Sequence, residues 1–326
     1  MDIETRLRRW ETFSHFSDEQ LSQLARCASL HRFPAGVTIF KAGDSSRDAY
    51  LVDTGRLRIQ RQTPYGLYTL AELGEGEIFG ESSYLDGEVR SGDAFVIAET
   101  ELLSFNPVAL EALAGLDQRI TVALYWSFWK SLATKLRTTN EKLTQFFSEA
   151  GKPPSSPSLE PKGTPADFRI DLAAKRKLFQ EQKLSNLEIN FLSTLSKEQQ
   201  VAPGEVIFHE GDVGDKMYIV LDGRVMISKY IPGAGEEALA FLERGDYFGE
   251  MALIDNQPRS ADAKAPEEGA VLLAIPRDVV EGLLDIHKVS SLRLLRILSN
   301  LIAKRLRELN EKLITWFIFS GGGGQG

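Results

Sequence analysis

Apolar residues at the start of the chain recur with the period of an α-helix. Between residues 4 and 31 they lie mostly at three- and four-residue steps, which is typical of one buried helical face. Ser17 can act as an N-cap, and Gln20, three residues later, can complete a capping box. We therefore expect residues 4–31 to be helical, with a helix start at Ser17.

The period changes to two after Pro34. Short apolar runs with alternating polar positions are separated by turns, and helical spacing returns from Pro107 to about Phe147. Short strands with turn signals about every 8–12 residues are typical of a β-barrel or sandwich. We expect strands at residues 37–39, 49–52, 57–61, 68–73, 94–99 and 101–106. The fold class is thus mainly β with flanking α-helices.

This order of elements occurs twice. Residues 202–208 match 33–40, residues 217–223 match 49–55, and Asn310–Leu313 repeat Asn140–Leu143. The near-constant offset of 168 to 170 residues indicates a tandem duplication. A last helical segment from about residue 279 to residue 319 is expected to break near 285–289.

A stretch rich in Pro, Ser and Gly lies between the copies, and such a composition cannot build a packed core. We therefore predict four parts. They are a first domain at residues 1–148, a linker at 149–166, a second domain at 167–320 and a disordered Gly-rich tail at 321–326.

One stretch of the second copy combines residues that suit an anion bearing a sugar. Gly249 lets the backbone approach a phosphate, and the N–H groups of a following helical turn can donate to it. Arg259 can fork onto phosphate oxygens, whereas Glu250 would repel them and suits sugar hydroxyls instead. The first copy repeats the nine-residue interval with Glu81 and Arg90.

The sequence Phe-Gly-Glu-Met-Ala-Leu at 248–253, followed by Pro-Arg-Ser-Ala at 258–261, resembles the phosphate-binding cassette of cyclic-nucleotide-binding domains. The whole repeat resembles the nucleotide-binding domain of catabolite activator proteins and of cAMP-dependent kinase regulatory subunits. The resemblance implies two tandem jelly-roll β-barrels, each with N- and C-terminal helices. It assigns ligand binding to Gly249, Glu250, Met251, Ala252, Arg259 and Ser260, and in the first copy to Gly80, Glu81, Ser82, Ser83, Arg90 and Ser91.

The first copy departs from the family pattern. Ser82 and Ser83 replace an apolar-Ala pair, Val89 replaces Pro, and Gly92 replaces Ala. This copy either binds a cyclic nucleotide, binds another ligand, or is an empty structural copy. In the second copy the alternative is a purely structural ion pair between the acid and the arginine.

The resemblance implies cAMP first and cGMP second as the ligand, with a cyclic dinucleotide as another possibility. Aromatic residues of the C-terminal helices are candidate lids, because rings stack on bases, or they pack within the protein. The repeated asparagines of these helices either read base edges or are solvated. These residues are Phe146, Phe147, Trp316, Phe317, Asn140 and Asn310.

Composition narrows the function. The net charge of −8 and the pI of about 5.3 argue against a protein that coats nucleic acid. Cys27 is the single cysteine, so no intrachain disulfide can form, which fits a cytoplasmic protein. We expect no signal peptide and no membrane insertion, since the apolar run at 313–319 is too short. The histidines lack metal-ligand spacing and no catalytic motif occurs, so we expect neither a metal, a cofactor nor an enzyme.

The output is expected to be a change in binding to an unknown protein effector. The sequence after the second repeat leaves no space for a helix-turn-helix, and residues 7–11 are not a kinase pseudosubstrate. The C-terminal helices carry apolar stripes that serve either intrachain contacts or a homodimer. The stripes comprise Leu124, Phe128, Leu132, Leu136 and Leu143, and Leu294, Leu295, Leu298, Leu301, Ile302, Leu306, Leu309 and Leu313. The alternative to a sensor is a scaffold with degenerate ligand sites.

Overall fold

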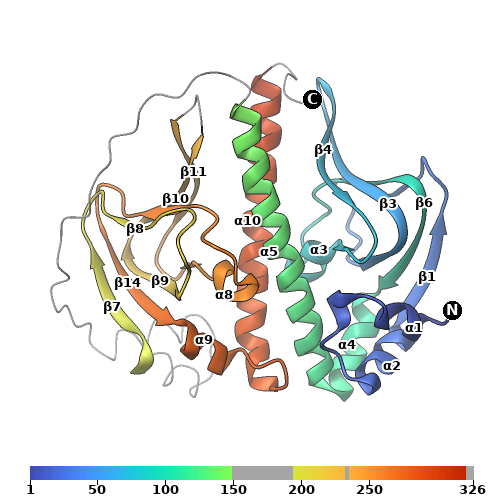
Figure 1. Ribbon diagram of the computed structural model, residues 1–326. Helices are drawn as coiled ribbons and strands as arrows, with labels where there is room; N and C mark the ends of the chain where they lie inside the picture. Colours follow the sequence, from blue (N-terminus) through green and yellow to red (C-terminus); the bar gives the residue numbers. More distant parts are fainter. Residues whose placement is uncertain (149–193, 232–234, 321–326) are drawn as a thin grey trace. The chain divides into compact units, whose positions relative to one another are not determined.

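The computed structural model describes residues 1–148, 194–231 and 235–320. The predicted linker, the start of the second predicted domain up to residue 193 and the Gly-rich tail lie outside these residues, as do the side chains of Phe146 and Phe147. The chain divides into two compact units (Figure 1). The first contains Met1–Thr139 and Ile286–Gly326, and the second contains Asn140–Asp285. The C-terminal segment of the second repeat therefore belongs to the unit of the first repeat.

The first unit begins with α1 (Ile3–Arg8), η1 (Glu11–Phe13) and α2 (Asp18–Cys27). The predicted capping box is confirmed, because Ser17 accepts from the Gln20 N–H while the Gln20 side chain accepts from the Ser17 N–H. The expectation of helix up to residue 31 is wrong at its end. Residues 28–33 instead form β1, which pairs with the last strand of the sheet.

The strands of the first unit form one six-stranded antiparallel sheet. Its main order is β1-β6-β3-β4, with β2 paired to β6 and β5 paired to β3. The two pairs of short strands expected at 49–61 and 94–106 are in fact two long strands. The bounds are β1 Ala28–Phe33, β2 Thr38–Phe40, β3 Ala49–Thr63, β4 Gly66–Leu73, β5 Ile78–Phe79 and β6 Asp93–Phe105.

The long strands bend where their pairing changes register, near Gly55. This glycine has φ 93°, and a Cβ there would lie 2.3 Å from the Glu99 carbonyl oxygen. Only glycine fits both the left-handed backbone and the close approach of the neighbouring strand. The bend lets continuous strands contribute to both faces of the fold.

The helices of the first unit are α3 (Glu81–Asp86), α4 (Pro107–Leu116), the part of α5 (Gln118–Ser148) up to residue 139, η2 (Val289–Ser291) and α10 (Leu292–Phe319). The single helix expected from Pro107 is interrupted at Asp117. The break expected near 285–289 is present between α9 and α10. One apolar core joins α1, α2, α4 and α5 to the sheet, and a second fills the sheet interior around Phe40, Val52 and Phe79.

The second unit repeats this design with two four-stranded sheets, ordered β11-β10-β13-β8 and β12-β9-β14-β7. β9 and β10 replace β3, and β13 and β14 replace β6. Together with the first unit, this confirms a mainly β, jelly-roll fold in tandem copies. The elements are β7 Lys197–Val201, β8 Val206–Phe208, β9 Lys216–Gly223, β10 Val225–Ile231, β11 Gly235–Leu242, β12 Tyr247–Phe248, α8 Met251–Asp255, β13 Asp262–Lys264, β14 Ala270–Pro276 and α9 Arg277–Leu283.

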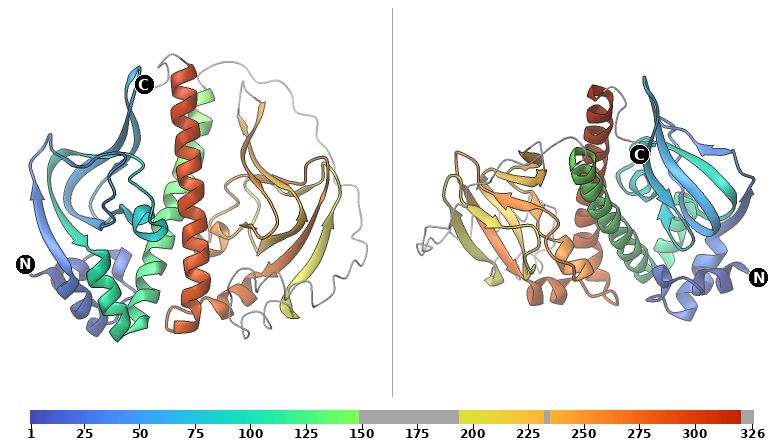
Figure 2. Two further views of the ribbon diagram at one scale, coloured as in Figure 1. Left: turned by 180° about the vertical axis from the view of Figure 1, so that it is seen from behind. Right: turned by 45° about the horizontal axis from the view of Figure 1, so that its top comes forward.

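The helices α5, over residues 118–139, and α10 lie side by side within the first unit (Figures 1 and 2). Arg296 of α10 places its guanidinium 5.4 Å from the ring centre of Tyr125 of α5. Most of the apolar stripe of α10 is buried, including Leu298, Ile302 and Leu306. This burial within the chain favours the intrachain interpretation of the stripe.

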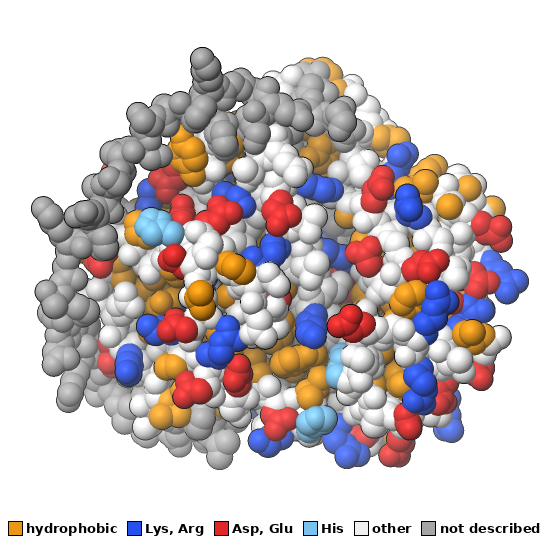
Figure 3. All heavy atoms as spheres, viewed as in Figure 1, with side chains coloured by type: hydrophobic (Ala, Val, Ile, Leu, Met, Phe, Trp, Pro, Cys, Tyr) orange, Lys and Arg blue, Asp and Glu red, His pale blue; other side chains and the backbone are white. Residues whose placement is uncertain are grey.

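The surface carries both signs of charge. On the face shown in Figure 3, Lys and Arg side chains are interspersed with Asp and Glu. Within the described residues, no helix combines the length and the hydrophobicity needed to cross a membrane.

Candidate functional site

Both cassettes begin with a left-handed glycine. Gly80 has φ 78° and Gly249 has φ 77°, and each comes directly before the buried acid of its copy. A Cβ at either glycine would lie 2.6 Å from Nη1 of the cassette arginine, Arg90 or Arg259. The glycine therefore provides the turn into α3 or α8 and leaves room for the guanidinium beside the backbone.

The first cassette arginine is held by neutral groups. Arg90 is 2% exposed, and its Nη1 and Nη2 donate to the carbonyl oxygens of Gly80 (3.0 Å) and Asp48 (2.7 Å). Its Nε donates to Ser46 Oγ at 3.1 Å, and Phe40 lies under its guanidinium at 4.1 Å. Among the described residues no carboxylate lies within 4.0 Å of it. Burial lowers the pKa of Arg90, which nevertheless stays charged at neutral pH.

The second cassette arginine has the same surroundings. Arg259 donates to the carbonyl oxygens of Gly249 (2.6 Å) and Lys216 (2.7 Å) and lies 4.2 Å from the ring centre of Phe208. Its Nε is buried and has no hydrogen-bond partner in the described part of the chain. Its paired donors thus go to backbone carbonyls rather than to Glu250. Burial lowers the pKa of Arg259 as well.

A buried cation without a carboxylate partner is costly, because carbonyl oxygens replace only part of its lost hydration. An anionic oxygen at this position would form charge-assisted hydrogen bonds, which are stronger than those to neutral acceptors. The two arginines are therefore the groups in each copy that suit an anion.

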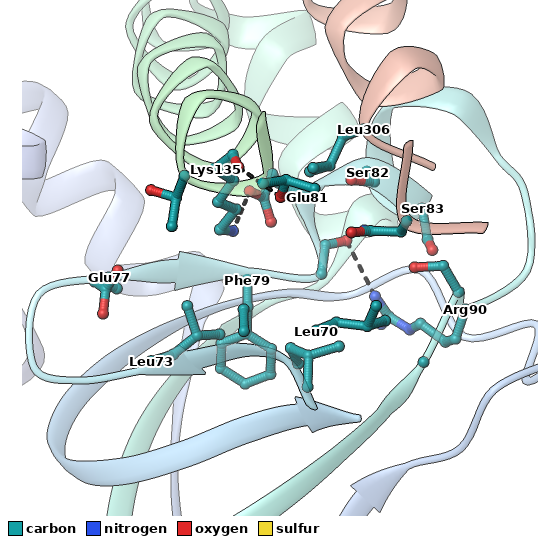
Figure 4. A pocket seen from close by; sticks show the side chains of 18 of the residues that line it. Leu70, Leu73, Glu77, Phe79, Glu81, Ser82, Ser83, Arg90, Lys135 and Leu306 are labelled. Atoms are coloured by element: carbon teal, nitrogen blue, oxygen red, sulfur yellow. Dashed lines mark hydrogen bonds and ion pairs between the residues drawn. The ribbon is translucent and has the colours of Figure 1, made fainter. Parts of the chain in front are cut away.

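The acid of the first copy faces helix α5. Glu81 is 1% exposed, and its Oε1 accepts from Ser131 Oγ at 3.0 Å and forms an ion pair with Lys135 Nζ (Figure 4). Lys135 also donates to the Ile78 carbonyl oxygen at 2.6 Å. Sequence reasoning missed Ser131 and Lys135. The sequence contains one sign of their role: the two residues lie four positions apart on α5, so they share one face of that helix.

The candidate residues of the first copy line a single cavity. Empty space of about 860 Å³, including the open mouth, lies between the cassette, an apolar floor of the sheet and two helices. Figure 4 shows Phe79, Leu70 and Leu73 on the floor, with Glu81 and Arg90 on different sides of the cavity. All six predicted residues contribute to the lining, namely Gly80, Glu81, Ser82, Ser83, Arg90 and Ser91.

The helix α10 completes this cavity. Leu306 and Asn310 are among its lining residues, together with side chains of α5. Arg307 forms an ion pair with Asp86 (Nε to Oδ2, 2.7 Å) and donates to Ser83 Oγ at 3.1 Å and to the Val89 carbonyl oxygen at 2.9 Å. No pattern along the sequence assigns a helix of the second repeat to the first site.

The structure accounts for two of the departures in the first cassette, Ser83 and Gly92. Ser83 supplies a hydroxyl that accepts from Arg307, which alanine could not do. A Cβ at Gly92 would lie 2.9 Å from Ile59 Cγ2 and 3.0 Å from the Gln60 carbonyl oxygen, so glycine relieves a close contact. These two residues thus fit the packing around the first cassette.

Of the predicted lids, Phe317 packs on Tyr68 with ring centres 4.9 Å apart. This contact supports its interpretation as a packing residue of the first unit. Asn310 lies at the cavity, whereas Asn140 belongs to the second unit.

The second cassette lies on β12, α8 and the loop before β13. Glu250, Met251 and Ala252 are buried, and Ser260 Oγ lies 3.9 Å from Met251 Sδ. A Cβ at Gly214 would lie 2.3 Å from the Cβ of Ala252, so a second glycine, missed in the sequence, packs against the turn. The six predicted residues of this copy are therefore close together.

The chain is similar in sequence to known proteins. The chain is 25% identical over 271 residues to a cGMP-dependent protein kinase of Eimeria tenella, covering 83% of this chain and 22% of the kinase. It is 28% identical over 261 residues to a cAMP-dependent protein kinase regulatory subunit of Dictyostelium discoideum, covering 76% of this chain and 63% of the subunit. The chain thus spans less than two thirds of either relative.

A solved structure of the regulatory domain of Toxoplasma gondii PKA with cAMP is 19% identical and covers 89% of this chain and 93% of that chain. Its TM-score of 0.32 is too low to support a structural argument. The family model for the cyclic nucleotide-binding domain matches residues 30–115 and 198–287, together more than half of the chain. The chain therefore belongs to the cyclic nucleotide-binding domain family and carries two copies of the domain in tandem.

Proposed function

We propose that this chain is a non-enzymatic cyclic-nucleotide sensor that prefers cAMP to cGMP and changes its binding to a protein partner when the ligand is bound. One observation carries the proposal. Arg90 and Arg259 are both buried, without a carboxylate in ion-pair range among the described residues, and each lies against a left-handed glycine.

The chemistry of a cyclic nucleotide matches this arrangement. Its phosphate carries one negative charge, which each guanidinium would neutralise, while backbone N–H groups of the cassette turn would donate to the same oxygens. The ribose hydroxyl would donate to the acid. Glu81 has this capacity, because a carboxylate accepts about four hydrogen bonds and two are given by Ser131 and Lys135.

The output is proposed to be a protein interaction. Two similar proteins are named a cGMP-dependent protein kinase and a cAMP-dependent protein kinase regulatory subunit, which supports an output through a protein. A ligand shifts a conformation only through different affinities for the two states. The contacts of α3 with α5 and α10 in the first unit link the cassette to elements that could present such a surface.

The alternative is a scaffold that keeps the fold without ligand. It is favoured by the contacts that already satisfy the first site, since Lys135 pairs with Glu81 and carbonyl oxygens accept from Arg90. A cyclic dinucleotide is a further alternative ligand. The scaffold would bind none of these nucleotides, and the other alternative would bind a cyclic dinucleotide rather than cAMP.

Isothermal titration of the full chain with cAMP, cGMP and a cyclic dinucleotide separates these functions. The sensor proposal predicts binding of cAMP that is tighter than that of cGMP. Absence of heat and of thermal stabilisation with all three ligands would favour the scaffold. Affinity capture of protein partners with and without cAMP then tests the switch, which requires at least one partner whose recovery depends on the ligand.

A further inference from the structure

A second cavity of the first unit lies between the N-terminal segment, the turn before β5 and helix α5. Its empty space, including the open mouth, is about 730 Å³, and its lining comes from residues 11–135 of that unit. It shares Glu77, Thr134 and Lys135 with the lining of the nucleotide cavity described above. Most of its lining side chains are polar, whereas the nucleotide cavity has an apolar floor. We therefore expect this cavity to suit a small polar molecule rather than a base.

Two lysines of α5 give the second cavity its positive charge. Lys135 Nζ donates to the Ile78 carbonyl oxygen at 2.6 Å and pairs with Glu81 (Figure 4). An ammonium group has three N–H donors, so one donor of Lys135 remains available to a ligand. Lys130 is exposed at the same cavity, and no carboxylate in the described part of the chain lies within 4.0 Å of its Nζ. Both lysines can therefore donate to an anionic group in this cavity.

The same lining offers acceptors for a positively charged group. Glu11 and Glu77 contribute two exposed carboxylates. The hydroxyl groups act as acceptors as well, because their protons are already used within the protein. Ser127 Oγ donates to the Thr12 carbonyl oxygen at 2.9 Å, and Thr12 Oγ1 donates to a backbone carbonyl oxygen at 2.8 Å. A ligand that satisfies the whole lining must therefore bring N–H donors together with an anionic group.

We propose that this cavity binds a small zwitterion, an α-amino acid with a polar side chain. Its carboxylate accepts from Lys130 and Lys135, and its ammonium donates to Glu11, Glu77 and the hydroxyl oxygens. Two acidic and two basic side chains in one lining balance the two charges of such a ligand. A phosphate would be repelled by the two carboxylates, and a polyamine would be repelled by the two lysines. The inference goes beyond the proposed function and does not depend on it.

Saturation-transfer difference NMR of the full chain, titrated with L-serine, tests this proposal. Two further probes of similar size each lack one charge. Glycerate carries a hydroxyl in place of the ammonium, and ethanolamine lacks the carboxylate. We expect both to bind at least about tenfold more weakly than serine, because each loses charge-assisted hydrogen bonds.

Three exposed variants then locate the serine. Lys130→Met and Glu11→Gln each remove one charged partner from the lining, and each should weaken serine binding at least about fivefold. Lys41→Met removes a positive charge at an exposed position outside this lining and should leave serine binding unchanged. Circular dichroism confirms that each variant is folded.

Absence of saturation transfer to serine on the folded chain would overturn this inference, and so would equal affinities for the three probes. Unchanged serine binding in both Lys130→Met and Glu11→Gln would place the serine outside this cavity and would also overturn it. These results are separate from those for the nucleotide sites, because calorimetric titration with cAMP tests the proposed function independently.

Discussion

Arg307 and Asp86, 221 positions apart in the sequence, form a two-pronged ion pair. Nε of Arg307 lies 2.7 Å from Oδ2 of Asp86, and Nη2 lies 3.2 Å from Oδ1. Both side chains are largely buried, with exposures of 18% and 15%. The pair connects the last helix of the chain to the C-terminal end of the first cassette helix, so the first site depends on a segment from the second repeat.

Replacing Arg307 by Ala should loosen α10 and weaken the first site. The change leaves the largely buried Asp86 carboxylate without its partner, and such a loss costs about 1–3 kcal/mol. We expect faster hydrogen exchange in residues 303–313 and a lower affinity of the first site for ligand. Arg293→Ala, an exposed change on the same helix, should alter neither quantity. Equal exchange in both variants would show that the ion pair does not hold the helix.

Replacing Lys135 by Met should destabilise the first unit. Glu81, which is 1% exposed, would keep only Ser131 as its side-chain donor, and unpairing one member of a buried ion pair costs on the order of 3 kcal/mol. Urea unfolding followed by circular dichroism measures this loss. Lys130→Met, at an exposed position of the same helix, should cost less than about 1 kcal/mol. Similar losses in both variants would contradict the role assigned to Lys135.

Gly80→Ala should cost more stability than Gly36→Ala. Both glycines have left-handed φ angles, 78° and 87°, so both variants carry backbone strain of about 1 kcal/mol. A Cβ at Gly80 would also lie 2.6 Å from Arg90 Nη1 and 2.8 Å from the Asp48 carbonyl oxygen, whereas no atom lies within 4 Å of one at Gly36. The melting temperature of Gly80→Ala should therefore fall further. Equal melting temperatures would mean that the cassette accommodates the methyl group.

His15 should make the first unit less stable in mild acid. Burial, more than any other cause, lowers the pKa of His15 below its ordinary value of 6.5, with a smaller contribution from Lys130. The unfolded chain therefore binds this proton at a higher pH than the folded chain does, so stability is lost as the pH falls below about 6.5.

His15→Gln should reduce this pH dependence, because glutamine can still donate to the Ala123 carbonyl oxygen, which lies 3.0 Å from Nε2 of the histidine. The measurement compares the free energy of unfolding of each protein at pH 7.5 and pH 5.5. An equal drop in both proteins would assign the acid sensitivity to other groups.

The local chemistry of the cassettes could be predicted from sequence. Gly80, Glu81 and Arg90 lie within one turn and the loop after it, so their spacing alone places them together. The capping box at Ser17 was predictable for the same reason. The tandem fold followed from the duplication, because each repeat carries the same order of turns and apolar runs.

Contacts between distant segments could not be predicted in this way. Which helix covers the first cavity depends on side chains such as Arg307 and Asp86, and no periodicity along the chain pairs them. Strand continuity was also missed, since β3 passes through the bend at Gly55 without ending. Residues 53–55 (Asp-Thr-Gly) are typical of a turn, but β3 pairs with β6 both before and after them, so β3 continues as a single strand.

Titration calorimetry with cAMP on four proteins tests the central claim, that the buried cassette arginines bind the nucleotide phosphate. The four are the unchanged chain, Arg90→Ala, Arg259→Ala and the double variant, each confirmed as folded by circular dichroism. We predict two bound cAMP molecules per unchanged chain, one in each single variant and none in the double variant. Unchanged binding in the double variant, or no binding to the unchanged chain, would contradict the claim.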